Sequence, residues 1–184
     1  MMLQRQISFK IKKLFIYGDH VDTDRIIAGK YTKTLDRKLL AQHVLEDLDP
    51  FFAQTVQNGD AIIAGKNFGC GSSREQAPLA LKSSGIGLII ARSFARIFFR
   101  NAINVGLPVM ELPEHTMTQD SILSVDMARG EVIDHSQDRI YWAEPLPSFV
   151  QEIMAAGGLV EFLRDENNIS RLSGLNYEVD HGWR

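Results

Sequence analysis

The sequence contains very little cysteine: Cys70 is the only one in 184 residues. A disulfide within the chain is therefore impossible, and the chain alone lacks the three or four thiolates that hold an iron–sulfur cluster. The five histidines lie far apart and show no zinc-site spacing; they are His20, His43, His115, His135 and His181. We therefore expect no metal site formed by this chain alone.

Long apolar segments and a strong charge of either sign are also missing. No apolar run approaches the ~20 residues of a membrane-spanning helix. The first 13 residues include four basic and no acidic side chains, but they lack the apolar segment of a secretory signal. We expect a cytoplasmic protein, with a short organellar transit peptide as the alternative. The formal net charge of -3 does not indicate nucleic acid or an anionic membrane as a partner.

What the sequence does contain is an alternation of strand and helix patterns within the length of one domain. Short apolar runs predict strands at residues 14–17, 61–64, 87–91 and 107–112, and helix patterns lie between them at 37–48, about 76–84 and 94–104. Asp36 and Ser93 are suitable N-caps, and Gly85 and Gly106 are suitable residues to end a helix. This order predicts an α/β domain with some parallel strand pairing.

The last third of the chain has a different pattern. Residues 122–125 and 131–133 predict antiparallel strands, and residues 149–154 and 159–163 predict two short helices. From residue 165 onward the sequence is polar and weakly patterned. We therefore assign residues 1–164 to one domain and residues 165–184 to a C-terminal tail that is mobile or bound to a partner.

The densest chemical signal is the run Gly69-Cys70-Gly71-Ser72-Ser73-Arg74-Glu75. Glycines let the backbone approach a ligand closely, the start of a helix offers N–H groups to an anion, and Arg74 suits a carboxylate. Ser72 or Ser73 is a candidate cap for the next helix, although Pro78 moves its expected regular start toward Gln76. The run predicts a carboxylate site flanked by hydroxyls; the alternative is a glycine-rich turn without a ligand. It matches no P-loop, dinucleotide or serine-hydrolase motif.

Three ordered motifs resemble those of one known family. Asn67–Pro78 closely resembles the signature of the swivelling domain of the aconitase superfamily, and Ser93–Pro108 resembles its second signature. Gly18–Asp24 resembles a loop near the start of the small subunits of isopropylmalate isomerases. The resemblance runs from about Leu14 to Leu163.

The resemblance implies both a fold and an activity. The fold is α/β, a three-layer β/β/α swivelling domain of the aconitase type with a mixed sheet. The activity is that of the small subunit of a two-subunit hydro-lyase, which isomerises a hydroxy-diacid by dehydration and rehydration, here 2-isopropylmalate to 3-isopropylmalate in leucine biosynthesis. A [4Fe-4S] cluster is then expected on the large subunit and no cofactor on this chain, in a heterodimer or a dimer of heterodimers. The alternatives are a small subunit of homoaconitase or of a dimethylmalate-type dehydratase, or a non-catalytic carboxylate-binding module.

Position within the motifs also implies roles for individual residues. Ser72 matches the serine that takes a proton from the substrate, Arg74 matches the residue that binds a substrate carboxylate, and Ser73 matches a neighbour that orients the site. Asp24 matches an acid near the catalytic pocket, with a turn-capping aspartate as the alternative. Because a serine hydroxyl is a weak base in water, Ser72 has to be held as an alkoxide by donors such as loop N–H groups and Arg74.

The segment Tyr31-Thr32-Lys33-Thr34 falls where small subunits of this family carry a substrate-discriminating loop. We expect Thr32, Lys33 and Thr34 to contact the substrate, with Lys33 near the group that differs among substrates. A solvated loop lysine is the alternative for Lys33.

Three further features bear on the site. Gln76 stands where a histidine is frequent in the family, so no role of that histidine is transferred. Cys70 is expected to be non-nucleophilic. Arg92, Arg96 and Arg100 recur at four-residue steps, which predicts one helix face that meets substrate, partner or solvent.

Overall fold

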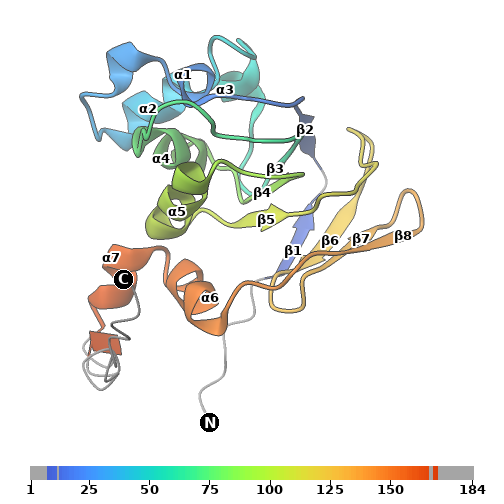
Figure 1. Ribbon diagram of the computed structural model, residues 1–184. Helices are drawn as coiled ribbons and strands as arrows, with labels where there is room; N and C mark the ends of the chain where they lie inside the picture. Colours follow the sequence, from blue (N-terminus) through green and yellow to red (C-terminus); the bar gives the residue numbers. More distant parts are fainter. Residues whose placement is uncertain (1–7, 12, 166–167, 170–184) are drawn as a thin grey trace, which may run out of the picture.

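The computed structural model describes residues 8–11, 13–165 and 168–169, and their strands and helices form three layers (Figure 1). A parallel sheet lies in the middle, an antiparallel sheet covers one of its faces, and helices cover the other. Within these residues no helix is long and apolar enough to cross a lipid bilayer. The helices are α1 (Thr23–Ile26), the short 3-10 helix η1 (Gly29–Tyr31), α2 (Arg37–His43), α3 (Phe52–Thr55), α4 (Gln76–Ser83), α5 (Arg96–Val105), α6 (Ser148–Ala155) and α7 (Leu159–Leu163).

The parallel sheet has buried side chains on both of its faces. Its strands, in spatial order, are β2 (Leu14–Ile16), β3 (Ala61–Ala64), β4 (Leu88–Ala91) and β5 (Val109–Glu111). Every residue of β3 and β4 is buried. Ile62 packs into the core beneath the helices, whereas its neighbour Ile63 packs into the core between the two sheets. Continuous apolar strands of this kind need cover on both faces, and this requirement produces the three layers.

The antiparallel sheet has one buried and one solvated face. Its strands, in spatial order, are β1 (Ser8–Ile11), β6 (Leu123–Asp126), β7 (Glu131–Asp134) and β8 (Arg139–Trp142). Leu123, Val125 and Val132 face the core between the sheets, and the residues that alternate with them face outward. Neither β1 nor β8 follows from the sequence pattern, because β1 is short among basic residues and β8 exposes its apolar Ile140 and Trp142.

The helix predicted at residues 37–48 begins where expected but ends early, at His43. The Asp36 carboxylate caps α2 by accepting the N–H groups of Lys38 and Leu39 at 2.9 and 3.3 Å. The prediction that this helix continues to residue 48 is wrong, because Val44 is extended and Leu45 has φ of +58°. The Leu45 N–H instead donates to the carbonyl of Ile26 at 2.8 Å, so a tertiary hydrogen bond replaces the next helical turn.

The start of α5 also differs from the prediction. The helix begins at Arg96 after Ala95, and no side chain caps it. Ser93 is therefore not the N-cap; its hydroxyl accepts the N–H of Asn67 at 2.9 Å. Arg92 lies outside the helix, so the three spaced arginines do not form one helix face. Gly106 ends the helix in the left-handed conformation, as predicted.

The three-layer α/β fold is confirmed, and the parallel and antiparallel pairing that was expected in one mixed sheet is divided between two sheets. The predicted helices near the C-terminus are present as α6 and α7, with Gly157 and Gly158 at positive φ between them. The predicted tail lies outside the described residues except for Asp165, Asn168 and Ile169. The division of the chain at residue 164 stays a prediction.

Candidate active site

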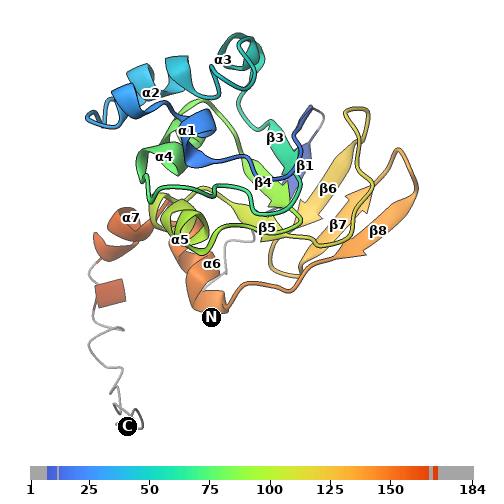
Figure 2. The ribbon, with the colours of Figure 1, turned by 45° about the horizontal axis from the view of Figure 1, so that its top comes forward.

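The loops after β2, β3 and β4 run side by side beyond the carboxyl-terminal ends of these strands (Figure 2), and Ser72 and Arg74 lie in the loop after β3. The parallel pairing of β2 and β3 continues beyond the sheet, because the Gly69 N–H donates to Val21 O at 2.7 Å and the Thr23 N–H donates to Cys70 O at 2.8 Å. On the other side the Phe68 N–H donates to Ser93 O at 3.0 Å. The middle loop, residues 65–74, is thus held from both sides. In open α/β sheets this edge is the usual place for a ligand.

Two glycines allow this close packing of the loops. A Cβ at Gly65 would overlap the side chain of Asp19, whose carboxylate accepts the Lys66 N–H at 2.7 Å. Gly69 has φ of +76°, and a Cβ there would overlap the buried ring of Phe98. The glycines therefore bring the middle loop onto its neighbours and fix where the following serines emerge.

Ser72 and Ser73 are both exposed, and neither caps α4. The helix starts at Gln76, as expected from the position of Pro78. The prediction of a serine N-cap is wrong, because Glu75 occupies the cap position and makes no side-chain hydrogen bond there. The hydroxyls are thus left outside the helix. The structure gives Ser72 Oγ a contact of 3.2 Å with the Thr23 hydroxyl, which also donates to Ser72 O at 3.0 Å.

Arg74 and Asp24 form an ion pair between the middle loop and α1. The Arg74 side chain is 19% exposed and the Asp24 side chain 61% exposed, so the guanidinium is the more enclosed partner. Asp24 is not a capping aspartate: the cap of α1 is Asp22, whose carboxylate accepts the Arg25 N–H at 2.8 Å. The structure therefore brings Ser72, Arg74 and Asp24 together, through elements that are far apart in sequence.

The segment from Gly29 to Thr34 adjoins Arg74. A Cβ at Gly29 would lie 3.5 Å from Arg74 Nη2, and Gln76 Nε2 donates to Thr32 O at 2.8 Å. Gln76 therefore links α4 to this segment, a contact that the sequence motif did not reveal. Lys33 is exposed at its outer surface.

The two threonine hydroxyls of the segment make local contacts. Thr32 Oγ1 donates to Gly29 O at 2.8 Å, and Thr34 Oγ1 accepts the Asp36 N–H at 3.0 Å. They stabilise the segment itself, and the proposed substrate contacts of Thr32, Lys33 and Thr34 stay predictions.

Cys70 and the charged groups nearby do not form a nucleophile or a metal centre. Burial, together with the charge of Asp22, raises the pKa of the Cys70 thiol, which disfavours the reactive thiolate. Among the described residues, no three histidine, cysteine or acidic side chains come together as a metal site would require. The arrangement suits carboxylate binding and proton transfer.

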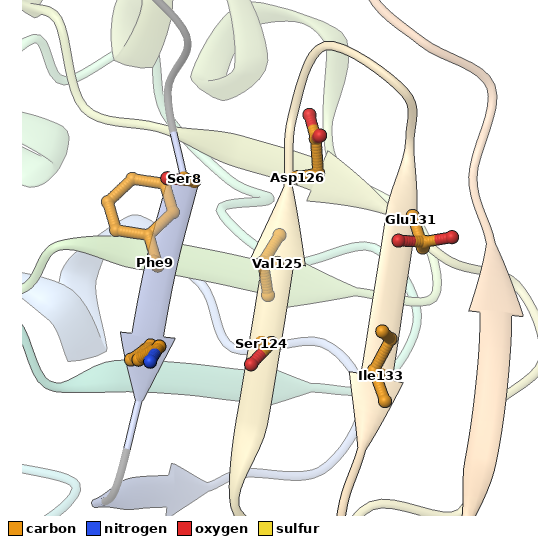
Figure 3. Close-up of a pocket in the computed structure, with 8 residues that line it drawn as sticks. Ser8, Phe9, Ser124, Val125, Asp126, Glu131 and Ile133 are labelled. Carbon is orange, nitrogen blue, oxygen red and sulfur yellow. The ribbon is translucent and has the colours of Figure 1, made fainter.

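A separate hollow of about 420 Å³ lies over β1, β6 and β7 (Figure 3). Its lining includes Lys10, Ser124, Asp126 and Glu131 but none of the predicted site residues. It belongs to the antiparallel sheet, whereas the site belongs to the edge of the parallel one.

One residue next to Ser72 was missed by the sequence analysis. Thr23 is 1% exposed, and its hydroxyl is directed at Ser72. A signal was available, because Thr23 lies inside the Gly18–Asp24 motif, but a contact across 49 residues of sequence is not visible in a local pattern.

Comparison with known proteins identifies the family of the chain. Residues 51–115 match the family model described as "Aconitase C-terminal domain". The chain is 52% identical over 159 residues to the 3-isopropylmalate dehydratase small subunit of Thermodesulfovibrio yellowstonii, covering 84% of this chain and 94% of the relative. It is 46% identical over 155 residues to the subunit of the same name from Aliarcobacter butzleri, covering 84% and 93%.

A solved structure shows the same fold. The crystal structure of 3-isopropylmalate dehydratase from Methanocaldococcus jannaschii superposes with a TM-score of 0.82 at 42% identity, covering 91% of this chain and all of that one. These relatives are more than 40% identical to the chain over nearly their whole length, and they share the name 3-isopropylmalate dehydratase. The chain belongs to the family of 3-isopropylmalate dehydratase small subunits.

Proposed function

We propose that this chain is the small subunit of a two-subunit hydro-lyase that converts 2-isopropylmalate to 3-isopropylmalate in leucine biosynthesis. The names of its relatives support this activity. The observation that carries the proposal is the placement of an exposed hydroxyl, Ser72, on the same tight loop as the enclosed guanidinium of Arg74. A base and a carboxylate anchor are the two groups that a dehydration of a hydroxy-diacid needs from this side of the substrate.

The chain's own residues do not fit an iron–sulfur cluster. Its single thiol, Cys70, has a raised pKa, and a cluster needs several thiolates. The proposal therefore assigns the [4Fe-4S] cluster to the large subunit, where it would supply the Lewis acid for the loss of the hydroxyl. The two chains would assemble as a heterodimer or a dimer of heterodimers, with the active site across the interface.

In the proposed reaction Ser72 moves one proton. As an alkoxide it takes the proton from the carbon next to the hydroxyl-bearing carbon; the C–H electron pair becomes the double bond, and the hydroxyl group leaves. A hydroxide then adds to the carbon that lost the proton, and the Ser72 hydroxyl returns its proton to the carbon that lost oxygen, which restores the alkoxide. Substrate and product have the same atoms, and Ser72 ends as it began.

Arg74 holds the substrate during both half-reactions. Its planar guanidinium presents paired donors to a carboxylate, and its ion pair with Asp24 fixes its direction. In this proposal Asp24 acts through Arg74, Ser73 orients the site, and the Thr32–Thr34 segment contacts the group that differs among substrates. A hydroxyl and a guanidinium alone do not specify isopropylmalate, so this segment is where discrimination is proposed.

The proposal is tested with Ser72→Ala in the complex reconstituted anaerobically with the large subunit. Loss of a positioned base lowers kcat by roughly 100- to 10,000-fold. Substrate should still bind, because Arg74 is unchanged. Ser83→Ala, in the helix that follows the same loop, is the matched control and should keep near-normal turnover.

Substrate and partner are tested in the same preparation. A panel of 2- and 3-hydroxy diacids should show isopropylmalate as the preferred substrate; preference for a homocitrate-type or dimethylmalate-type acid would move the assignment to those dehydratases. Full turnover by Ser72→Ala would remove Ser72 as the base. Purification of the chain without any larger partner would favour a carboxylate-binding module. The cytoplasmic location also stays a prediction, which fractionation of cells would test.

A further inference from the structure

The hydroxyl of Thr23 is buried and directed at the hydroxyl of Ser72. Thr23 opens α1 directly after its cap Asp22, and the residue is 1% exposed. Its N–H donates to Cys70 O at 2.8 Å, so the backbone of Thr23 is fixed against the loop that carries Ser72. Its Oγ1 lies 3.0 Å from Ser72 O and 3.2 Å from Ser72 Oγ. A side chain held in this way has few alternative positions.

Counting protons limits what these two contacts can be. A threonine hydroxyl has one proton and two lone pairs. When that proton goes to Ser72 O, Thr23 offers a lone pair to Ser72 Oγ, and the Ser72 proton points inward to Thr23. The lone pairs of Ser72 Oγ then face outward, toward the exposed side where a substrate binds.

The same pair behaves differently when Ser72 has lost its proton. Ser72 Oγ then only accepts, and rotation about the Thr23 Cβ–Oγ1 bond can move the Thr23 proton from Ser72 O to Ser72 Oγ. A hydrogen bond to an anionic oxygen is shorter and about twice as strong as one between neutral groups. One buried hydroxyl can thus serve both protonation states of Ser72.

We propose that Thr23 is a positioning residue for Ser72, which accepts the Ser72 proton in the resting state and donates its own proton to the alkoxide. This inference rests on the proposed role of Ser72 as the base. The donors expected from sequence were loop N–H groups and Arg74, but Arg74 is paired with Asp24 and the structure gives Ser72 Oγ its contact with Thr23. Thr23 acts through Ser72 and needs no contact with the substrate.

Thr23→Val in the reconstituted complex tests this proposal, because valine keeps the shape of threonine and removes the hydroxyl. We expect kcat to fall roughly 10- to 100-fold, the range of a hydrogen bond to a charged group. The KM should change less than about twofold, since Arg74 is untouched, and the acid limb of the pH–rate profile should move to higher pH. Thr23→Ser should restore most of kcat and the normal limb.

The matched control is Thr55→Val in α3. The Thr55 hydroxyl donates only to the backbone carbonyls of Phe51 and Phe52, away from the site, and its loss should leave kcat and the pH profile unchanged. If Thr23→Val does not assemble with the large subunit, Thr23→Ala removes the same hydroxyl with less crowding, and the same result is expected.

The outcomes separate the two proposals. A Thr23→Val enzyme with normal kcat and an unmoved acid limb overturns the role of Thr23, even when Ser72→Ala is inactive. A rise in KM alone, or no recovery in Thr23→Ser, also overturns it, since either result indicates a loss of loop structure. An active Ser72→Ala enzyme would instead remove the base itself. In the Ser72→Ala background, Thr23→Val should lower the remaining activity no further.

Discussion

Gly69→Ala is the substitution that tests most directly how the loop of Ser72 is held. Gly69 has φ of +76°, and an added Cβ would lie 2.5 Å from Phe98 Cβ and closer still to the ring. Gly71 also has a positive φ, +90°, but a Cβ there would be 3.4 Å from Thr23 Oγ1, an ordinary contact. The two glycines share the backbone cost of an added side chain and differ in the space available for it.

The expected losses of stability follow from the backbone cost and from the steric overlap. A left-handed backbone costs an alanine about 1–2 kcal/mol relative to glycine. Overlap with a packed ring adds about 1–3 kcal/mol at Gly69 only. Phe98 has little room to move, because the centroid of its ring lies 5.3 Å from the ring centroid of Phe68 and 6.2 Å from that of Phe94. We expect the free energy of unfolding to fall by about 2–5 kcal/mol for Gly69→Ala and about 1–2 kcal/mol for Gly71→Ala, or roughly 4–20 °C against 2–8 °C in Tm.

Urea unfolding of the isolated chain, followed by circular dichroism, measures both values. Phe98→Leu provides a second step: combined with Gly69→Ala it should recover part of the overlap cost, so that the double variant is more stable than the sum of the single changes predicts. Equal losses for Gly69→Ala and Gly71→Ala would refute the reasoning, because the Phe98 contact would then contribute nothing.

Two further predictions concern the helical layer and the substrate segment. Burial, together with Asp49, which accepts the Tyr17 hydroxyl at 3.0 Å, raises the pKa of Tyr17 well above its ordinary 10. Above pH 10 the unfolded chain loses this proton and the folded chain keeps it, so the free energy of unfolding falls with rising pH by up to about 1.4 kcal/mol per pH unit. Tyr17→Phe should lack this slope in urea unfolding between pH 9 and 11. An unchanged slope in the variant would contradict the raised pKa of Tyr17. Lys33→Ala should change the ratio of kcat/KM for isopropylmalate to kcat/KM for a homocitrate-type acid by roughly 10-fold, which corresponds to the loss of one charge interaction with the substrate. The control Lys38→Ala, also at an exposed lysine, should leave this ratio unchanged. Equal ratios in both variants would remove Lys33 from substrate recognition.

The features that were predicted from sequence are those that a local pattern determines. β3 has the predicted bounds, because Ala61–Ala64 is an apolar run between a turn and a glycine loop. Asp36 caps α2, Gly106 ends α5, and Pro78 correctly moves the start of α4 to Gln76. Each of these depends on residues within a few positions along the chain.

The features that were missed depend on distant partners. β1 exists because residues 8–11 pair with residues 123–126, and α2 stops because Leu45 bonds to Ile26. Ser72 was a reasonable helix cap until the loop geometry placed it outside the helix. The motifs identified Ser72, Arg74 and Asp24 as candidate site residues. The ion pair of Arg74 with Asp24 and the contact of Thr23 with Ser72 form only where the loops after β2 and β3 meet.

The exposure of Ser72 limits what the chain can do without a partner. A serine hydroxyl ionises far above the ~10 of a tyrosine, so in contact with water almost none of it is alkoxide at neutral pH. One hydrogen bond from Thr23 and a nearby guanidinium gain full strength only where water is excluded. Since Ser72 and Ser73 are both exposed, the described loops do not provide that enclosure. Under the proposed function the surface that covers them belongs to the large subunit, and substrate added to this chain alone should therefore show no dehydration.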